Sequence, residues 1–181
     1  GYILTNLHVV VNPRTNRPYN AQGPIHIGVA ASFGQLPQNR YLAELVSGDN
    51  ALDLALLRIR ATASGGALPS DLGLTPVTIG DSDALALGDT LIVIGFPGLA
   101  NTVTVTGGRV SGFEPEGKYD RAWIKTDASL APGNSGGLAI NETGEMVGVP
   151  SIVVRSEDDE TAKIGGIRPI KLAGALLQLV K

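Results

Sequence analysis

The stretch that decides the fold is Pro132-Gly133-Asn134-Ser135-Gly136-Gly137, a serine set among glycines. It lies downstream of Thr5-Asn6-Leu7-His8 and of Asp53-Leu54-Ala55-Leu56-Leu57, so histidine, aspartate and serine follow one another in that order. A serine hydroxyl attacks a carbonyl carbon poorly unless an imidazole takes its proton and a carboxylate fixes the tautomer of that imidazole. The three blocks therefore indicate nucleophilic catalysis, with Ser135 as nucleophile, His8 as base and Asp53 as the orienting acid.

Only two histidines can serve as the base. His8 follows apolar residues 2–4 and leads into three valines, so we expect a strand over residues 3–11 with the ring where that strand ends. His26 alternates with Ile25 and Ile27 in a second strand-like run. A solvent-facing or hydrogen-bonded histidine is the ordinary outcome there, since no motif surrounds it. We therefore expect the base to be His8.

The serine block also fits Gly-x-Ser-x-Gly, the nucleophile turn of α/β-hydrolases, but the order of the other residues excludes that class. An α/β-hydrolase places its acid and histidine after the serine, and residues 136–181 contain no histidine. A subtilisin-like order needs the acid before the histidine, and residues 1–7 contain no carboxylate. The trypsin-like order is the one that remains.

Three blocks in register resemble the trypsin-like serine proteases, and within them the bacterial HtrA/Deg branch. The blocks are Gly-Tyr-Ile-Leu-Thr-Asn-Leu-His8, Leu52-Asp53-Leu-Ala-Leu-Leu and Gly133-Asn-Ser135-Gly-Gly. Segments over residues 80–112 look similar to the same branch, so the resemblance covers nearly the whole chain. It implies a serine endopeptidase in which the amides of Gly133 and Ser135 form the oxyanion hole.

The resemblance also implies the setting of the enzyme. Peptides or unfolded proteins are the expected substrates, no cofactor or metal is implied, and a periplasmic or other extracytoplasmic location in a bacterium is expected. Similar enzymes often carry a PDZ domain and assemble through their N-terminal part, so a homo-oligomer is expected to be possible for a full-length protein. Relatives also have residues ahead of the histidine block, so we expect this chain to be a protease domain truncated at its N-terminus.

Composition favours many short strands joined by tight turns, because the chain has 24 glycines and 11 prolines among 181 residues. We predict an all-β fold of two antiparallel, six-stranded-type barrels, the first one incomplete, followed by a C-terminal helix. The expected boundaries are 1–60 for the first barrel, 61–74 for a linker, 75–168 for the second barrel and 169–181 for the helix.

The resemblance also places the primary substrate pocket. Its floor is expected at Ser129, six positions before the nucleophile, and its walls at Val149, Pro150, Ser151 and Ile167. A preference for lysine or arginine would need a buried carboxylate at the floor, because an unpaired cation in a closed pocket is costly. We therefore expect a preference for small or medium aliphatic side chains.

Other features exclude several classes of function. There is no cysteine, which removes disulfides, thiol catalysis and cysteine-zinc sites. The net charge of −3 lacks the basic excess expected of a nucleic-acid binder, and no apolar run is long enough to span a bilayer.

Asp127 is expected to stabilise the loop before the nucleophile, and the acidic residues 157–160 to form a solvated hairpin tip, with a calcium site as the alternative. The alternative function is a catalytically incompetent peptide-binding or scaffolding module with the same fold.

Overall fold

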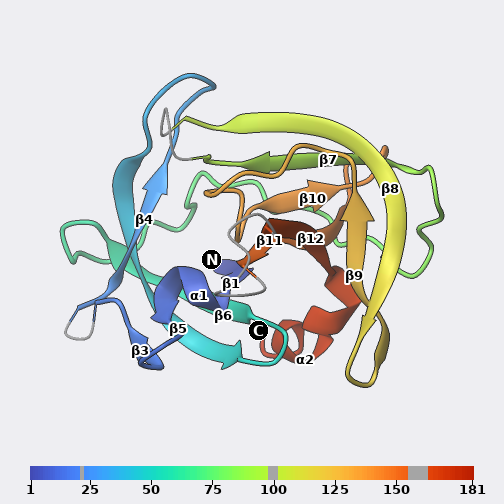
Figure 1. The fold of residues 1–181 in the computed structure, drawn as a ribbon. Helices are drawn as coiled ribbons and strands as arrows, with labels where there is room; N and C mark the ends of the chain where they lie inside the picture. The colour runs from blue at the N-terminus through green and yellow to red at the C-terminus, as the bar shows by residue number, and fades with distance from the viewer. Residues whose placement is uncertain (21–22, 98–101, 155–162) are drawn as a thin grey trace.

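The computed structural model describes residues 1–20, 23–97, 102–154 and 163–181, which are mostly strands. Strands β1, β6, β5 and β4 form a four-stranded antiparallel sheet, and β10, β11, β12, β9, β8 and β7 close into a barrel (Figure 1). The strands are β1 (Tyr2–Asn6), β2 (Val11–Asn12), β3 (Arg17–Pro18), β4 (Ile25–Val29), β5 (Gln38–Asp49), β6 (Leu54–Thr62), β7 (Thr90–Gly95), β8 (Thr104–Glu116), β9 (Tyr119–Thr126), β10 (Leu138–Ile140), β11 (Met146–Val154) and β12 (Lys163–Pro169). The predicted all-β fold, with one closed barrel and one incomplete one, is confirmed.

Strand β6 joins the two halves because both of its faces are buried. Ala55, Leu57 and Ile59 point into the core of the first sheet. Leu54 and Leu56 point the other way, into a cluster shared with Met146, Val149, Ile170, Ala173 and Leu176. Successive side chains of a strand face opposite sides, so a strand buried on both faces reads as a continuous apolar run. The Leu-Ala-Leu-Leu segment after Asp53 is such a run, and it fixes that aspartate at the junction of the halves.

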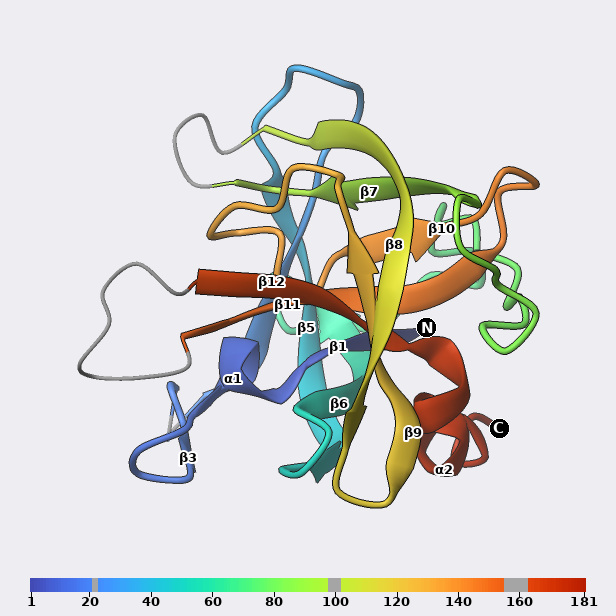
Figure 2. The same cartoon turned by 45° about the vertical axis from the view of Figure 1, so that its right-hand side comes forward.

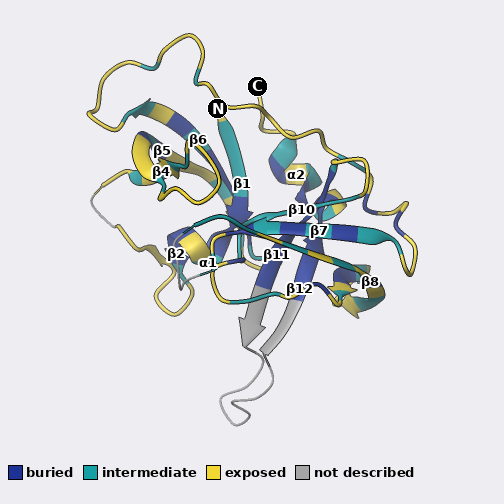
Figure 3. Cartoon of the chain, turned by 90° about the horizontal axis from the view of Figure 1, so that it is seen from above, coloured by how far each residue is buried: buried dark blue, intermediate teal, exposed yellow. Residues whose placement is uncertain are grey.

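The barrel has a core of its own. It is built from inward-facing residues that alternate along the strands: Leu91, Val93, Val110, Ile124, Ala139, Val147 and Ile167. Strand β1 contacts the barrel at β11, which carries buried positions (Figure 3).

The C-terminal segment packs on the cluster shared by the halves, as its apolar spacing predicts. After β12 the chain forms a 3₁₀ turn, η1 (Ile170–Ala173), and a single α-helical turn, α2 (Gly174–Leu177) (Figure 2). Ala173 and Leu176 are buried. The helix is shorter than the expected range 169–181, because Leu179 and Val180 donate their amides to carbonyls three residues back rather than four.

The expected strand over residues 3–11 is interrupted. Strand β1 ends at Asn6 and is followed by a helical turn, α1 (Leu7–Val10), before the two-residue strand β2. Valine favours strands, but here the amides of Leu7 and His8 donate to Asp53, 3.1 Å to its carbonyl and 2.9 Å to its carboxylate. Bonds to a distant residue therefore override the local preference, and His8 lies on a helical turn rather than at a strand end.

Candidate active site

His8 and Asp53 lie together in the structure. The Nδ1 atom of His8 is 2.6 Å from Oδ2 of Asp53, and the backbone amide of His8 donates to Oδ1 at 2.9 Å. Both side chains are partly exposed, 32% for His8 and 25% for Asp53. A carboxylate only accepts hydrogen bonds, so the proton of a neutral imidazole belongs on Nδ1 and Nε2 carries the free lone pair. This is the tautomer that a general base needs.

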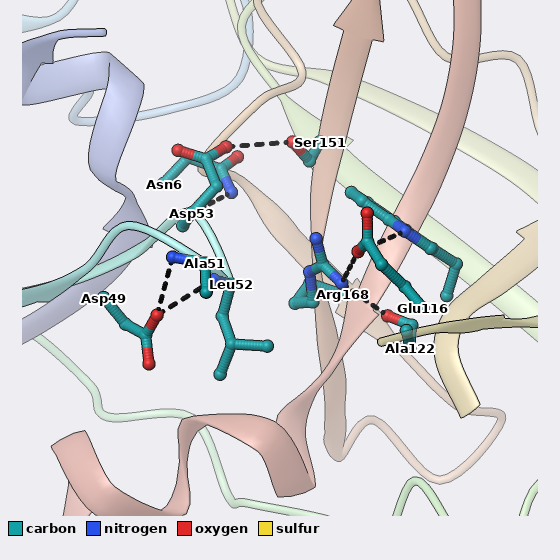
Figure 4. A network of polar contacts seen from close by, with 10 residues as sticks. Asn6, Asp49, Ala51, Leu52, Asp53, Glu116, Ala122, Ser151 and Arg168 are labelled. Atoms are coloured by element: carbon teal, nitrogen blue, oxygen red, sulfur yellow. Dashed lines mark hydrogen bonds and ion pairs between the residues drawn. The ribbon is translucent and has the colours of Figure 1, made fainter. Parts of the chain in front are cut away.

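Asp53 reaches this position through an unusual backbone. Its φ of +53° is in the left-handed region, which residues other than glycine adopt rarely and aspartate more readily than most. The turn before it is fixed by Asp49, whose Oδ1 accepts the amides of Ala51 and Leu52, each at 2.9 Å (Figure 4). The carbonyl of Asp53 accepts the Leu7 amide. Two local features thus direct the carboxylate toward His8.

Ser151 is a second donor to the same carboxylate. It lies on β11 of the barrel, is fully buried, and its hydroxyl donates to Asp53 Oδ2 at 3.3 Å (Figure 4). Ser151 is one of the residues predicted for the pocket wall, and the sequence does not predict this contact. The two residues are 98 positions apart, so no local pattern could have indicated it.

The serine block forms a tight turn held by Asn134. The backbone amide of Asn134 donates to the Ala131 carbonyl, and the side-chain Oδ1 of Asn134 accepts the backbone amide of Ala131, both at 2.9 Å. Gly133 and Gly136 have φ values of +103° and +77°, which glycine adopts without strain. A Cβ on Gly136 would overlap Thr5 Oγ1, so this turn closes directly on strand β1. Ser135, partly buried, lies in this turn.

Asn6 links the serine turn to Asp53. Its side chain is fully buried, Nδ2 donates to the Asp53 carbonyl at 2.8 Å, and Oδ1 accepts the Gly136 amide at 2.6 Å. The amide of Gly136 also donates to the Pro150 carbonyl at 3.0 Å. The structure therefore brings the histidine, aspartate and serine blocks to one junction between the halves.

The residues expected around the substrate pocket have mixed positions. Ser129 is exposed, and its carbonyl accepts the Thr106 hydroxyl at 3.0 Å. Val149 and Pro150 are buried, Val149 in the cluster between the halves, and Ile167 is buried in the barrel core. The side chains of residues 152–154 and 163–165 lie outside the described part, so the pocket walls stay a prediction.

The structure also places two other residues that the sequence analysis considered, Asp127 and His26. Asp127 Oδ1 accepts the Arg109 amide at 2.6 Å, a bond that holds the strand before the serine turn to β8. His26 is exposed on β4. The acidic residues 157–160 lie outside the described residues. Among the residues that the structure describes, no group of three histidine, cysteine or acidic side chains could hold a metal, and no helix is long and apolar enough to cross a membrane.

Arg168 forms a second buried network. It is 3% exposed, donates to Glu116 at 2.9 Å and to the Ala122 carbonyl at 3.0 Å, and stacks 3.5 Å above the ring of Trp123 (Figure 4). Trp123 Nε1 donates to the same Glu116 carboxylate at 3.0 Å. The network ties the β8–β9 hairpin to β12, which gives this buried arginine a structural role.

Comparisons with known proteins agree with this geometry. Residues 1–149 match the family described as trypsin-like peptidase domain. Protease Do-like 8, chloroplastic, of Arabidopsis thaliana is 35% identical over 81% of this chain, and the periplasmic pH-dependent serine endoprotease DegQ of Escherichia coli K12 is 33% identical over 98%. A solved structure, the HtrA-type protease AlgW with decapeptide, covers 98% of the chain at 28% identity with a TM-score of 0.69.

The matched region is a part of each of these proteins. The chain spans 32% of the length of the Arabidopsis protein, 34% of DegQ and 47% of the AlgW chain. The family match covers most of the chain, and the relatives are HtrA/Deg serine proteases, as the sequence blocks predicted. The chain therefore belongs to the trypsin-like peptidase family, as a relative of the HtrA/Deg serine endopeptidases.

Proposed function

We propose that this chain hydrolyses peptide bonds as a serine endopeptidase through His8, Asp53 and Ser135. The observation that carries the proposal is the 2.6 Å contact between His8 Nδ1 and Asp53 Oδ2, because it leaves Nε2 as the basic nitrogen. The bond from Gly136, the residue after Ser135, to Asn6 supports it further, since it holds the serine turn beside the histidine turn.

The chemistry follows from these roles. Ser135 Oγ attacks the carbonyl carbon of the scissile bond while His8 Nε2 takes the hydroxyl proton. The imidazolium, stabilised by Asp53, then gives that proton to the leaving amine, and water releases the acyl group by the same route. The amides of Gly133 and Ser135 are proposed to donate to the oxyanion, and the left-handed Gly133 supports this because it lets the backbone turn so that these two amides converge. The mechanism needs no cofactor.

Small or medium aliphatic residues are the proposed preference on the acyl side of the cut. Ser129 at the expected floor carries no charge, so nothing there would compensate a buried lysine or arginine. Peptides or unfolded proteins are the proposed substrates, because the relatives are proteases and the AlgW structure contains a decapeptide. An extracytoplasmic location is proposed because DegQ and a Haemophilus influenzae relative are described as periplasmic. Assembly into a homo-oligomer is proposed for the full-length protein.

Peptide digestion tests this proposal. Two peptides that differ only in valine or arginine at one central position are incubated with the chain and with Ser135→Ala, and the products are identified by mass spectrometry. We expect cleavage after valine, little after arginine, and none in the variant. Binding of the valine peptide without cleavage by the unsubstituted chain would favour the incompetent peptide-binding module instead.

A further inference from the structure

Asn6 connects the two sides of the proposed triad with one buried side chain. Its donor end binds the Asp53 carbonyl at 2.8 Å, and its acceptor end binds the Gly136 amide at 2.6 Å. Asn6 and Gly136 are 130 positions apart, and Asn6 has no exposed surface. A buried amide with both ends bonded is rigid, because losing either partner would leave a desolvated polar atom unpaired.

The donor end of Asn6 acts on the backbone of Asp53. The left-handed conformation of Asp53 is sparsely populated for residues with a side chain, so it must be held by its surroundings. The carbonyl accepts two bonds, from the Leu7 amide at 3.1 Å and from Asn6. The orientation of the Asp53 carboxylate depends on this backbone conformation. Removing the Asn6 donor should therefore make the orientation of the carboxylate toward His8 less well defined.

The acceptor end of Asn6 acts on the serine turn. The Gly136 amide is shared between Asn6 Oδ1 and the Pro150 carbonyl, 3.0 Å away. The first bond ties the turn to β1 of the first half, and the second ties it to β11 of the barrel. Since Ser135 directly precedes Gly136, the bond to Asn6 fixes the position of Ser135 relative to the helical turn that carries His8.

We propose that Asn6 is a positioning residue that keeps the His8–Asp53 pair and the serine turn in register across the junction between the halves. The inference rests on the proposed function of these residues. Asn6 is too deeply buried to touch substrate, so its loss should lower kcat rather than raise KM. A misplacement of about 1 Å in such a site costs on the order of 100-fold, so we expect losses of about 10- to 100-fold.

The test compares Asn6→Ala, which removes both bonds, with Asn6→Asp, which keeps the shape and the acceptor and replaces the NH2 donor with a carboxyl oxygen. Asn141→Ala is the matched control, because the side-chain amide of Asn141 also forms hydrogen bonds, but among the described residues these stay within the turn of residues 141–145. Each variant is assayed for kcat and KM at a temperature where thermal melts show it folded. The His8 Nδ1 proton is followed by NMR, with His26→Gln giving the assignment between the two histidines.

We expect kcat to fall about 10- to 100-fold in both Asn6 variants, more in Asn6→Ala, with KM within about threefold. The His8 Nδ1 proton signal should shift or broaden in both, and Asn141→Ala should change neither kcat nor the signal. An unchanged kcat or an unchanged signal in folded Asn6 variants would overturn the inference. If Asn6→Ala does not fold, the isosteric Asn6→Asp gives the decisive result.

Failure of the proposed function gives a different pattern. An inactive unsubstituted chain would refute the peptidase proposal, while the NMR signal would still report on Asn6. A signal altered in the Asn6 variants but not in Asn141→Ala would support the positioning role, and an unaltered one would refute it.

Discussion

Replacing Asp53 with asparagine should disable the site while leaving its shape intact. Oδ1 of Asp53 accepts the His8 amide and Oδ2 faces His8 Nδ1, so only one of the two positions can hold the NH2 group of an asparagine. The backbone amide cannot accept, so the carbonyl oxygen must stay opposite it and the NH2 must face Nδ1. His8 then has to accept at Nδ1, and its proton moves to Nε2. The base is left in the wrong tautomer.

The expected loss follows from this exchange. An ionised acceptor becomes a neutral donor at 2.6 Å from the imidazole, and such a change in a Ser-His-Asp triad costs about 10⁴-fold in kcat, or about 5 kcal/mol of activation free energy. Folding should change far less, because the side chain keeps its volume and remains partly exposed.

The assay measures kcat for a valine-containing peptide near neutral pH, with the chain, Asp53→Asn and Asp71→Asn side by side. Asp71 is a suitable control because it is exposed and, within the part of the chain that the structure describes, accepts only the nearby Gly73 amide, at 2.7 Å. Thermal melts confirm that each variant is folded. A folded Asp53→Asn that keeps kcat within about tenfold of the unsubstituted chain would refute the assigned role of the carboxylate.

Two further changes test other parts of the structure. Gly136→Ala should lower the free energy of unfolding by about 1–3 kcal/mol in urea and reduce activity, since the φ of Gly136 is +77° and a Cβ there would overlap Thr5. Gly144→Ala is the control, because Gly144 has a φ of +81° but open space around it, so this variant measures the backbone cost alone. Equal losses of stability at both glycines would argue against the close approach of Gly136 to Thr5. The hydrogen bond from Arg60 lowers the pKa of Glu44 below its ordinary 4.5, so the stability that this pair contributes is present above that value and is lost as the pH falls through the lowered one. Urea midpoints should differ between Glu44→Gln and the unsubstituted chain at neutral pH and converge once the pH falls below the lowered pKa of Glu44, whereas a constant difference would contradict the pairing.

Much of the fold could be predicted because its signals are local. The apolar run after Asp53 predicts a strand buried on both faces, and the glycines around Ser135 predict a tight turn. Helix α1 was missed because its valines favour a strand, and only the bonds from Leu7 and His8 to Asp53 fold it into a helical turn.

The sequence predicts which residues form the candidate site, but not the hydrogen bonds that hold them in position. The order of the three sequence blocks, together with their resemblance to the HtrA/Deg branch, selects His8, Asp53 and Ser135; chain order alone would leave other aspartates and serines open. The bonds from Ser151 to Asp53 and from Gly136 to Asn6 span 98 and 130 positions, so they exist only once the barrel and the sheet are packed together. The same packing buries Val149 and Ile167 in apolar cores. The alternation of side chains along a strand does not by itself tell a core position from a position in a pocket wall.

The most direct test of the central claim is the reaction of this chain with a fluorophosphonate probe, read by intact mass beside a Ser135→Ala control. A fluorophosphonate phosphonylates a serine only when a neighbouring base activates its hydroxyl, so the reaction depends on Ser135 and His8 together. The account predicts a single adduct on the unsubstituted chain and none on Ser135→Ala. No adduct on a folded sample, or an equal adduct on the variant, would contradict it.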